Sequence, residues 1–311
     1  MREQVGDLIR SLPGGRRVLR GRRELRKRVR ARLRPTLPVH GSPAQVAARS
    51  RAPEDESFIT GNGLAARCRY VLNYGPLVVN EDRDNDWWFV NGDSLEYFFR
   101  NHAPDRFVLL SHNSDREIGR RFLRELRRPR LVAWFAQNPV LEHPKLRALP
   151  VGVANPYWPH GDQAALRAAQ AASAEKSRLF DVSFNVETNP SVRRYCLEQT
   201  GLELAPQRPF PEYLEGLARS WFCVSPRGNG IDCMRTWEAL YLKTIPVVTR
   251  SLVTEHHADL PLVVLDDWSE FRSIDFSPEL YRRLWGDWDP AELRLDRYCR
   301  RIEERVAELR R

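Results

Sequence analysis

From about Phe58 onward, short apolar runs alternate with stretches of helical periodicity. Four runs in the first half are typical of strands: RYVLNY, PLVV, RFVLLS (106–111) and RLVAWFAQN (130–138). GDSLEYFFRNH (92–102) and EIGRRFLRELRR (117–128) lie between them and have the periodicity of helices. Because parallel strands need a long crossover connection, usually a helix, this alternation predicts an α/β layer with a mostly parallel sheet.

The regularity breaks at LPVGVANPYWPHGD (149–162), where glycines and three prolines interrupt it. An alanine-rich helix is expected over 163–178, and a second alternation follows with RLFDVSFNV, RSWFCVS, TIPVV and LPLVVLDDW. The simplest architecture is a pair of Rossmann-like halves joined at about residues 152–178.

The C-terminal segment 289–311 predicts a further helix. Asp289 can cap it, Pro290 suits its first position, and Glu292 completes a capping box. An apolar stripe follows at Leu295, Tyr298, Ile302, Val306 and Leu309.

Basic residues are concentrated at the N-terminus. Residues 1–34 hold 13 Lys and Arg against three acids, and because the whole chain carries +9, the remainder is close to neutral at about −1. A protein that binds nucleic acid through its folded body would spread basic charge over that body, so we expect no nucleic-acid partner. Residues 34–57, rich in Pro, Ser and small residues, are typical of a linker.

Within the tail, residues 16–34 place apolar side chains at roughly helical spacing among arginines. Such a basic amphipathic segment can bind an anionic membrane surface. A solvated or partner-binding tail is the alternative, because four Lys against 46 Arg shows arginine enrichment along the whole chain. No run approaches the ~18–20 apolar residues of a spanning helix, and no secretory signal core is evident. We therefore expect a cytoplasmic protein, peripheral on the inner membrane face if the tail binds lipid.

One segment, SPRGNGIDCMRTWEAL (225–240), combines a glycine loop with a helix start. The loop leaves the carboxyl end of the strand WFCVS, where open α/β sheets bind ligands. Gly228 and Gly230 permit close approach of the backbone or positive φ. The helix is expected to begin near Asp232, so that its free N–H groups and dipole face the loop and favour a phosphate.

Arg227 and Arg235 add permanent positive charges, and arginine can hold phosphate oxygens with two hydrogen bonds. Glu238, one turn from Arg235, can accept hydrogen bonds from the vicinal hydroxyls of a ribose. Together these residues predict a nucleoside diphosphate site. The alternative is a simple turn followed by a surface Arg–Glu salt bridge. The third glycine of the dinucleotide fingerprint and the Walker lysine are both missing, which excludes those two phosphate-binding motifs.

The segment SPRGNGIDCMRTWEALYLKTIPVV, followed by LPLVVLDDWSEF, resembles the C-terminal half of exostosin-like glycosyltransferases. It is also similar to bacterial and viral polysaccharide-building glycosyltransferases with the same Arg-x-x-Glu-Ala helix. The blocks FVLLSHNSD, WFAQNPVLEHPKLRALPVGVAN and FDVSFNVETNPSVRR extend the resemblance over roughly residues 105–271. One departure is Lys243-Thr244, in the turn before IPVV, where a small residue is usual.

The resemblance implies an α/β protein of GT-B-like fold, with two facing Rossmann-like domains, a C-terminal helix and, here, a basic N-terminal tail. The expected boundaries are 1–56 for the basic tail and linker, 57–178 for the acceptor-side domain, 179–285 for the nucleotide-sugar-binding domain and 286–311 for the C-terminal helix.

The resemblance also implies a function. The chain would transfer a sugar from a nucleotide-sugar donor to a glycan or glycolipid acceptor, with no metal or other cofactor. The donor-binding positions would be Asn185, Arg193, Arg227, Gly228, Gly230, Asp232, Arg235 and Glu238. For Arg193, a solvated helix charge is the alternative. A nucleotide-sugar-binding or scaffolding subunit without transfer activity is the competing function.

The segment SHNSD (111–115) holds the candidate general base. It leaves a strand at its carboxyl end, so His112 or Asp115 can take the proton from an acceptor hydroxyl in an inverting transfer. The two arginines and the helix N-terminus would then stabilise the departing diphosphate. The alternative is that Asn113 and Asp115 cap the helix that follows. His143 is a weaker candidate.

Three aspartates, Asp82, Asp84 and Asp86, stand at alternate positions, as in the Asp-x-Asp metal sites of other transferases. A calcium loop would need glycine at the place of Trp87 and glutamate at the place of Asp93. We therefore expect no metal site in this segment.

Overall fold

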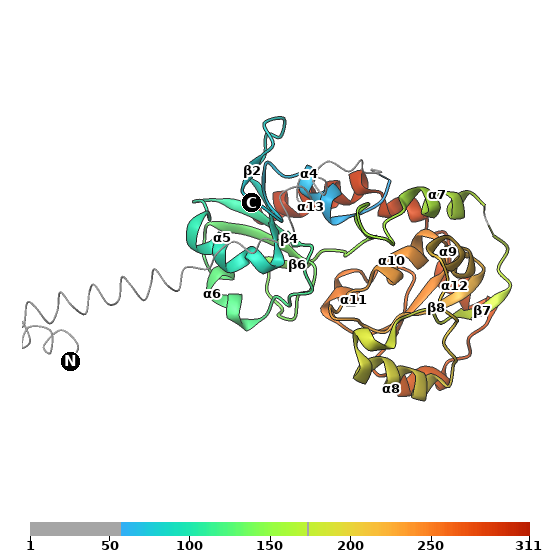
Figure 1. Ribbon diagram of the computed structural model, residues 1–311. Coiled ribbons are helices and arrows are strands. Elements are labelled where there is room, and N and C mark those ends of the chain that lie inside the picture. Colours follow the sequence, from blue (N-terminus) through green and yellow to red (C-terminus); the bar gives the residue numbers. More distant parts are fainter. Residues whose placement is uncertain (1–56, 173) are drawn as a thin grey trace, which may run out of the picture. The chain divides into compact units, whose positions relative to one another are not determined.

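The computed structural model describes residues 57–172 and 174–311 (Figure 1). All of these residues belong to one compact unit of α/β architecture with two sheets. The predicted tail, the membrane-binding segment and the linker, apart from Ser57 at its end, lie within residues 1–56, outside the described residues. Across the described part of the chain, no helix has the length and apolarity needed to cross a bilayer.

The first sheet has six strands in the order β2–β1–β3–β4–β5–β6. All neighbours are parallel except β1 and β2, which form an antiparallel edge. Its parallel strands follow one another in chain order, β1–β3–β4–β5–β6, and such a mixed sheet is compatible with a Rossmann-like domain. Its strands are β1 (Tyr70–Leu72), β2 (Val78–Val79), β3 (Trp87–Asn91), β4 (Phe107–His112), β5 (Leu131–Ala136) and β6 (Leu146–Ala148).

The sequence pattern missed β3 and β6. Strand β3 begins directly after the acidic run and is buried along its whole length, so it lacks the polar alternation of a half-exposed strand. The sheet is accompanied by α4 (Gly61–Ala66), α5 (Leu95–Asn101) and α6 (Leu123–Leu126), with 3₁₀ turns at Gly92–Ser94 and Arg120–Phe122. The next helix, α7 (Gln163–Ala171), packs against α9 (Phe210–Ala218) of the second half.

The helix predicted over 117–128 is shorter than expected, because it begins only at the 3₁₀ turn Arg120–Phe122 and ends at Leu126. The reason is a long-range backbone pairing. The Ile118 N–H donates to the carbonyl of Asn138 (2.8 Å), and the Ile118 carbonyl accepts from Val140 (3.0 Å). These bonds hold Ile118 in an extended bridge. The alanine-rich helix also ends early, at Ala171, and the last residue of the expected range, Arg178, is the first of strand β7 (Arg178–Asp181).

The second sheet is fully parallel and runs in chain order, β10–β9–β8–β7. Each strand coincides with an apolar run of the second alternation, so this part of the prediction is confirmed. The strands are β7 (Arg178–Asp181), β8 (Ser220–Val224), β9 (Ile245–Thr249) and β10 (Val263–Leu265). Their connections contain a 3₁₀ turn at Val186–Thr188 and the helices α8 (Pro190–Thr200), α9 (Phe210–Ala218), α10 (Met234–Tyr241) and α11 (Leu252–His256). A 3₁₀ turn at Trp268–Ser273 and α12 (Pro278–Trp285) follow β10.

The C-terminal helix α13 (Leu295–Arg310) begins later than predicted. Asp289 caps a separate 3₁₀ turn, Pro290–Leu293, by accepting from the Ala291 N–H (2.9 Å). Arg294 is extended and separates that turn from α13, so the predicted capping box does not form at the helix start. Glu292 instead pairs with two arginines of α13, Arg297 and Arg301.

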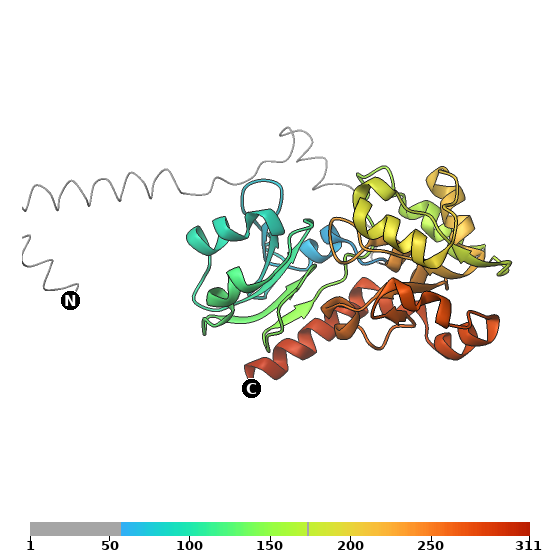
Figure 2. The same ribbon diagram turned by 90° about the horizontal axis from the view of Figure 1, so that it is seen from below.

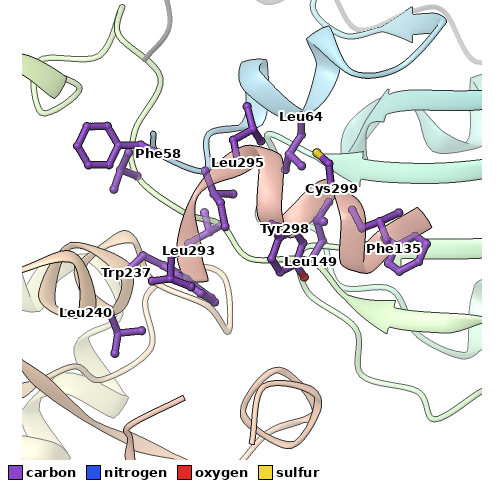
Figure 3. Packing of buried hydrophobic residues seen from close by; sticks show 14 of the residues in the cluster. Phe58, Leu64, Phe135, Leu149, Trp237, Leu240, Leu293, Leu295, Tyr298 and Cys299 are labelled. Carbon is purple, nitrogen blue, oxygen red and sulfur yellow. The ribbon is translucent and has the colours of Figure 1, made fainter. Parts of the chain in front are cut away.

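The apolar stripe of α13 is buried, as predicted, apart from its last residue, which is partly buried. The helix packs against β5 and α4 and runs along the first sheet (Figure 2). Its stripe belongs to the main core cluster, which also takes in Phe58, Phe135 and the α10 residues Trp237 and Leu240 (Figure 3). The Tyr241 hydroxyl donates to the Leu293 carbonyl (2.7 Å), so α10 and the C-terminal segment are tied together.

Candidate functional site

A cavity of about 870 Å³ is lined by residues that follow the carboxyl ends of β4, β5, β7 and β8. This is the edge at which open α/β sheets bind ligands. Its volume lies near the upper end of the range of small-molecule sites, about 300–1,000 Å³. Nine of the predicted site residues line it: His112, Asp115, Asn185, Arg193, Gly228, Gly230, Asp232, Arg235 and Glu238.

The glycine loop ends in an uncapped helix. Helix α10 begins at Met234, two residues later than expected, and its N-cap Cys233 makes no side-chain capping hydrogen bond. Cys233, Met234 and Arg235 all line the cavity. Since the first N–H groups of a helix have no partner within the helix, this end offers donors and the positive end of a dipole to an anion.

Of the two roles predicted for Gly228 and Gly230, positive φ does not apply, because neither residue has it. The other role, close approach of neighbouring groups to the backbone, remains. A Cβ on Gly228 would lie 3.0 Å from Nη2 of Arg193. One on Gly230 would lie 3.0 Å from Nδ2 of Asn138 and 3.2 Å from Oδ1 of Asp115. The missing side chains therefore make room for polar groups of the cavity wall.

Two buried arginines, Arg193 and Arg235, lie beside each other, and neither forms a close ion pair with a described carboxylate. They are 5% and 8% exposed, and their Cζ atoms lie 5.6 and 5.3 Å from the centre of the Phe184 ring. Among the described residues, no carboxylate lies within 4.0 Å of either guanidinium. Burial and the charge of Arg235 both lower the pKa of Arg193. The interpretation of Arg193 as a solvated helix charge is therefore wrong.

The two guanidinium groups differ in their hydrogen bonds. Arg193 donates to the carbonyls of Arg227 (3.1 Å) and Asn185. Arg235 donates to no described residue, and its Nε and Nη2 are buried without a partner. Because an unpaired buried charge is costly, this pair of cations is a ready site for an anion.

Glu238 is buried and accepts a hydrogen bond from the Tyr213 hydroxyl (2.7 Å). Burial raises its pKa, while the Tyr213 hydrogen bond and the charge of Arg235 oppose that rise. Within the described residues no ion pair joins it to Arg235. The surface salt bridge considered as an alternative is therefore wrong: both side chains are buried and both line the cavity.

Asp232 holds the loop in place. Its carboxylate accepts from the backbone N–H groups of Val151 (2.7 Å) and Cys233 (2.8 Å) and from Nε1 of Trp237 (2.8 Å). Val151 belongs to the segment after β6, so the carboxylate ties that segment to the start of α10. Since the protein already occupies both oxygens, we expect Asp232 to position the loop and not to contact a ligand.

At about pH 5, Asp232→Asn should lower the free energy of unfolding by about 1–3 kcal/mol, because the amide places an NH2 donor against one of the N–H groups that donate to Asp232 in the wild type. Burial raises the pKa of Asp232 to about 7. The stability that this group contributes is therefore present at low pH and is lost as the pH rises toward that value. Urea unfolding of both proteins should show a larger advantage of the wild type at about pH 5 than at about pH 8. An equal advantage at both would contradict this expectation.

Asn138, which the sequence analysis did not single out, joins the two loops that carry the predicted site. It is fully buried, and its Oδ1 accepts from the N–H groups of Ile231 (2.9 Å) and Asp232 (3.2 Å). Its Nδ2 donates to the Ser114 carbonyl (3.4 Å). The only signal in the sequence is its place just after an apolar strand, which does not reveal a partner 93 residues away.

His112 is the last residue of β4 and is buried. Its Nε2 lies 2.9 Å from the Pro150 carbonyl, and its Nδ1 accepts from the Asn113 N–H (2.7 Å). Burial lowers its pKa. Since the protein engages both ring nitrogens, His112 is poorly placed to take a proton from a ligand.

Asp115 is the stronger candidate base. It lines the cavity and is exposed, yet partial burial desolvates its carboxylate and raises its pKa, while a hydrogen bond from Asn229 opposes the rise. The idea that it caps the following helix is wrong, because that 3₁₀ turn begins at Arg120 with Gly119 as N-cap.

The remaining candidates lie elsewhere. Arg227 forms an ion pair with Glu117 (3.2 Å) and lines a separate cavity of about 330 Å³. His143 lines a further cavity beside His256. Asp86 is paired with Arg310. Within residues 57–172 and 174–311, no group of three or more His, Cys, Asp or Glu side chains is arranged to hold a metal ion.

Models of known protein families do not match this chain, and neither do curated protein sequences.

Proposed function

We propose that this protein is a metal-independent glycosyltransferase of exostosin-like, GT-B type, which transfers a sugar from a nucleotide-sugar donor to an acceptor hydroxyl. The observation that carries the proposal is the pair Arg193 and Arg235: two buried cations without a close ion pair among the described residues, beside an uncapped helix N-terminus in a cavity at the strand ends. A diphosphate supplies the charge and the acceptors that these groups lack.

The donor would lie along the second-sheet wall. Its diphosphate would contact Arg235, Arg193 and the first N–H groups of α10, and Glu238 would accept from the ribose hydroxyls. A third arginine of this wall, Arg208, is already neutralised by Asp181 (3.2 Å), so it is less available to a phosphate. Arg193 and Arg235 would therefore neutralise the diphosphate charge, a role that a metal ion has in other transferases.

The acceptor would enter from the side of Asp115. As the acceptor oxygen attacks the anomeric carbon, Asp115 takes its proton. The bond from that carbon to the phosphate oxygen breaks, and its electron pair leaves with the nucleoside diphosphate, whose charge the arginines stabilise. Asp115 supplies the one base that an inverting transfer needs. A donor-binding subunit without activity would share the arginines but would not depend on this carboxylate.

Thermal unfolding with a panel of nucleoside diphosphates tests the donor site. A diphosphate that binds the folded chain should stabilise it by about 2.7 kcal/mol at a concentration one hundred times its Kd. The matching nucleoside should stabilise it much less, because it lacks the phosphates that meet the arginines. If none of the uridine, guanosine, adenosine, cytidine and thymidine diphosphates raises the Tm, the proposed function is rejected.

A further inference from the structure

The two walls of the cavity differ in charge. Its lining residues between 183 and 238 include Arg193, Arg208 and Arg235, whereas those between 74 and 160 include no Lys or Arg among the described residues. The only carboxylate that lines it from the latter set is Asp115. A second anionic group would therefore be repelled from this wall, while a neutral polar molecule would not be.

Gln137 gives this wall an unused hydrogen-bonding group. It follows β5 directly, is 6% exposed and lines the cavity. Its side-chain amide makes no hydrogen bond to any described residue, and its Oε1 is buried without a partner. Its Nε2 also has no partner among these residues but is not enclosed as Oε1 is, so it can donate a hydrogen bond to a ligand hydroxyl in the cavity.

Trp158 gives the same wall an apolar face. It is 45% exposed, in contrast to the fully buried Trp134 and Trp237. Its backbone is held in a turn, because its N–H donates to the Asn155 carbonyl (3.0 Å) and its carbonyl accepts from Gly161 (2.9 Å).

The turn around Trp158 requires glycine at its end, since a Cβ on Gly161 would lie 2.1 Å from the Asn155 carbonyl oxygen. The ring of His160 stacks on the indole at 6.1 Å and 29°. The indole is therefore presented to the cavity from a fixed turn, at little entropic cost on binding.

We infer that the wall formed by Asp115, Gln137 and Trp158 binds an uncharged sugar residue of the acceptor. A pyranose has an apolar C–H face, which suits an indole, and a rim of hydroxyls, which suits an amide and a carboxylate. Trp158 stacks on the sugar ring, Gln137 bonds one hydroxyl, and Asp115 faces the hydroxyl that reacts. This inference rests on the proposed function, because it assigns the acceptor of that reaction.

Calorimetry with short saccharides tests it on the full chain. The probes are the neutral trisaccharides maltotriose, cellotriose and chitotriose and, as the charged counterpart, trigalacturonic acid. We expect at least one neutral probe to bind and trigalacturonic acid to bind more weakly than that probe. Trp158→Ala should weaken the binding about tenfold, and Trp158→Phe, which keeps an aromatic face, should restore most of it. Gln137→Leu should also weaken it.

Leu204→Ala is the matched control, because Leu204 is an exposed apolar residue that does not line the cavity. It should leave saccharide binding unchanged. Nucleoside diphosphate affinity should stay the same in all four variants. Absence of binding by every neutral probe, tighter binding of the acidic probe, or unchanged binding in Trp158→Ala would overturn the inference while diphosphate binding persists. If the wild type does not bind a nucleoside diphosphate, the proposed function itself is contradicted.

Discussion

Replacing Asp115 with asparagine should lower turnover by about 10²–10⁴-fold while donor affinity stays the same. The change removes the base that takes the acceptor proton, yet it keeps the size of the side chain and its hydrogen bond with Asn229. Asp115 caps no helix, so the fold should not weaken. Turnover is measured as release of nucleoside diphosphate, and donor affinity by calorimetry in parallel.

Asp105→Asn is the matched control, since Asp105 is an exposed aspartate that does not line the cavity. It should retain full turnover. If Asp115→Asn also retains full turnover, the general base is another residue. If no turnover is measured even for the wild type, the chain only binds its donor. The assays are run with and without EDTA, and loss of wild-type turnover on chelation would contradict metal independence.

The pH profile of the wild type gives a second readout of Asp115. Turnover requires the ionised carboxylate, and desolvation raises its pKa above that of an ordinary aspartate. Activity should therefore be present at neutral pH and be lost, as the pH falls, at a higher pH than an exposed aspartate would give. The Asp115→Asn variant should lack this acid limb in its residual rate.

Replacing Arg235 with alanine should weaken nucleoside diphosphate binding by about 2–3 kcal/mol, or about 30–150-fold, because a charge-assisted hydrogen bond is lost. The affinity of Arg235→Lys should lie between those of the wild type and Arg235→Ala, since lysine keeps the charge but cannot donate two parallel hydrogen bonds. Arg282→Ala, at an exposed arginine of α12, serves as the control. Calorimetry that shows unchanged affinity in Arg235→Ala would remove the donor site from this loop.

Without ligand, the free energy of unfolding of Arg235→Ala should stay within about 1 kcal/mol of the wild-type value. The Arg235 guanidinium donates no hydrogen bond to the described residues and lies beside the charge of Arg193. Its removal ends the desolvation of the charge and the repulsion from Arg193, but it also loses the attraction of Glu238, which helps to raise the pKa of Arg235, and the contact with Phe184, so the changes oppose one another. A large fall in Tm would show that Arg235 serves the fold instead of a ligand.

The local pattern of the sequence was sufficient to predict the strands β4, β5, β8, β9 and β10 and the loop–helix segment at 225–238. Each is specified by an apolar run or by glycines within a few residues, and burial of such a run depends little on which segment covers it. The apolar stripe of α13 was predictable for the same reason. The part of the chain outside residues 57–172 and 174–311 adds nothing to this comparison.

The tertiary structure alone decided how polar groups are paired. Ile118 leaves its helix because Asn138 and Val140 offer backbone partners about 20 residues away. Asn138 bonds the glycine loop across 93 residues, and Asp232 bonds Val151 across 81. Arg193 of α8 and Arg235 of α10 meet beside the same ring, that of Phe184. Apolar periodicity is a property of neighbours along the chain, but a hydrogen bond or an unpaired charge depends on residues that only folding brings together.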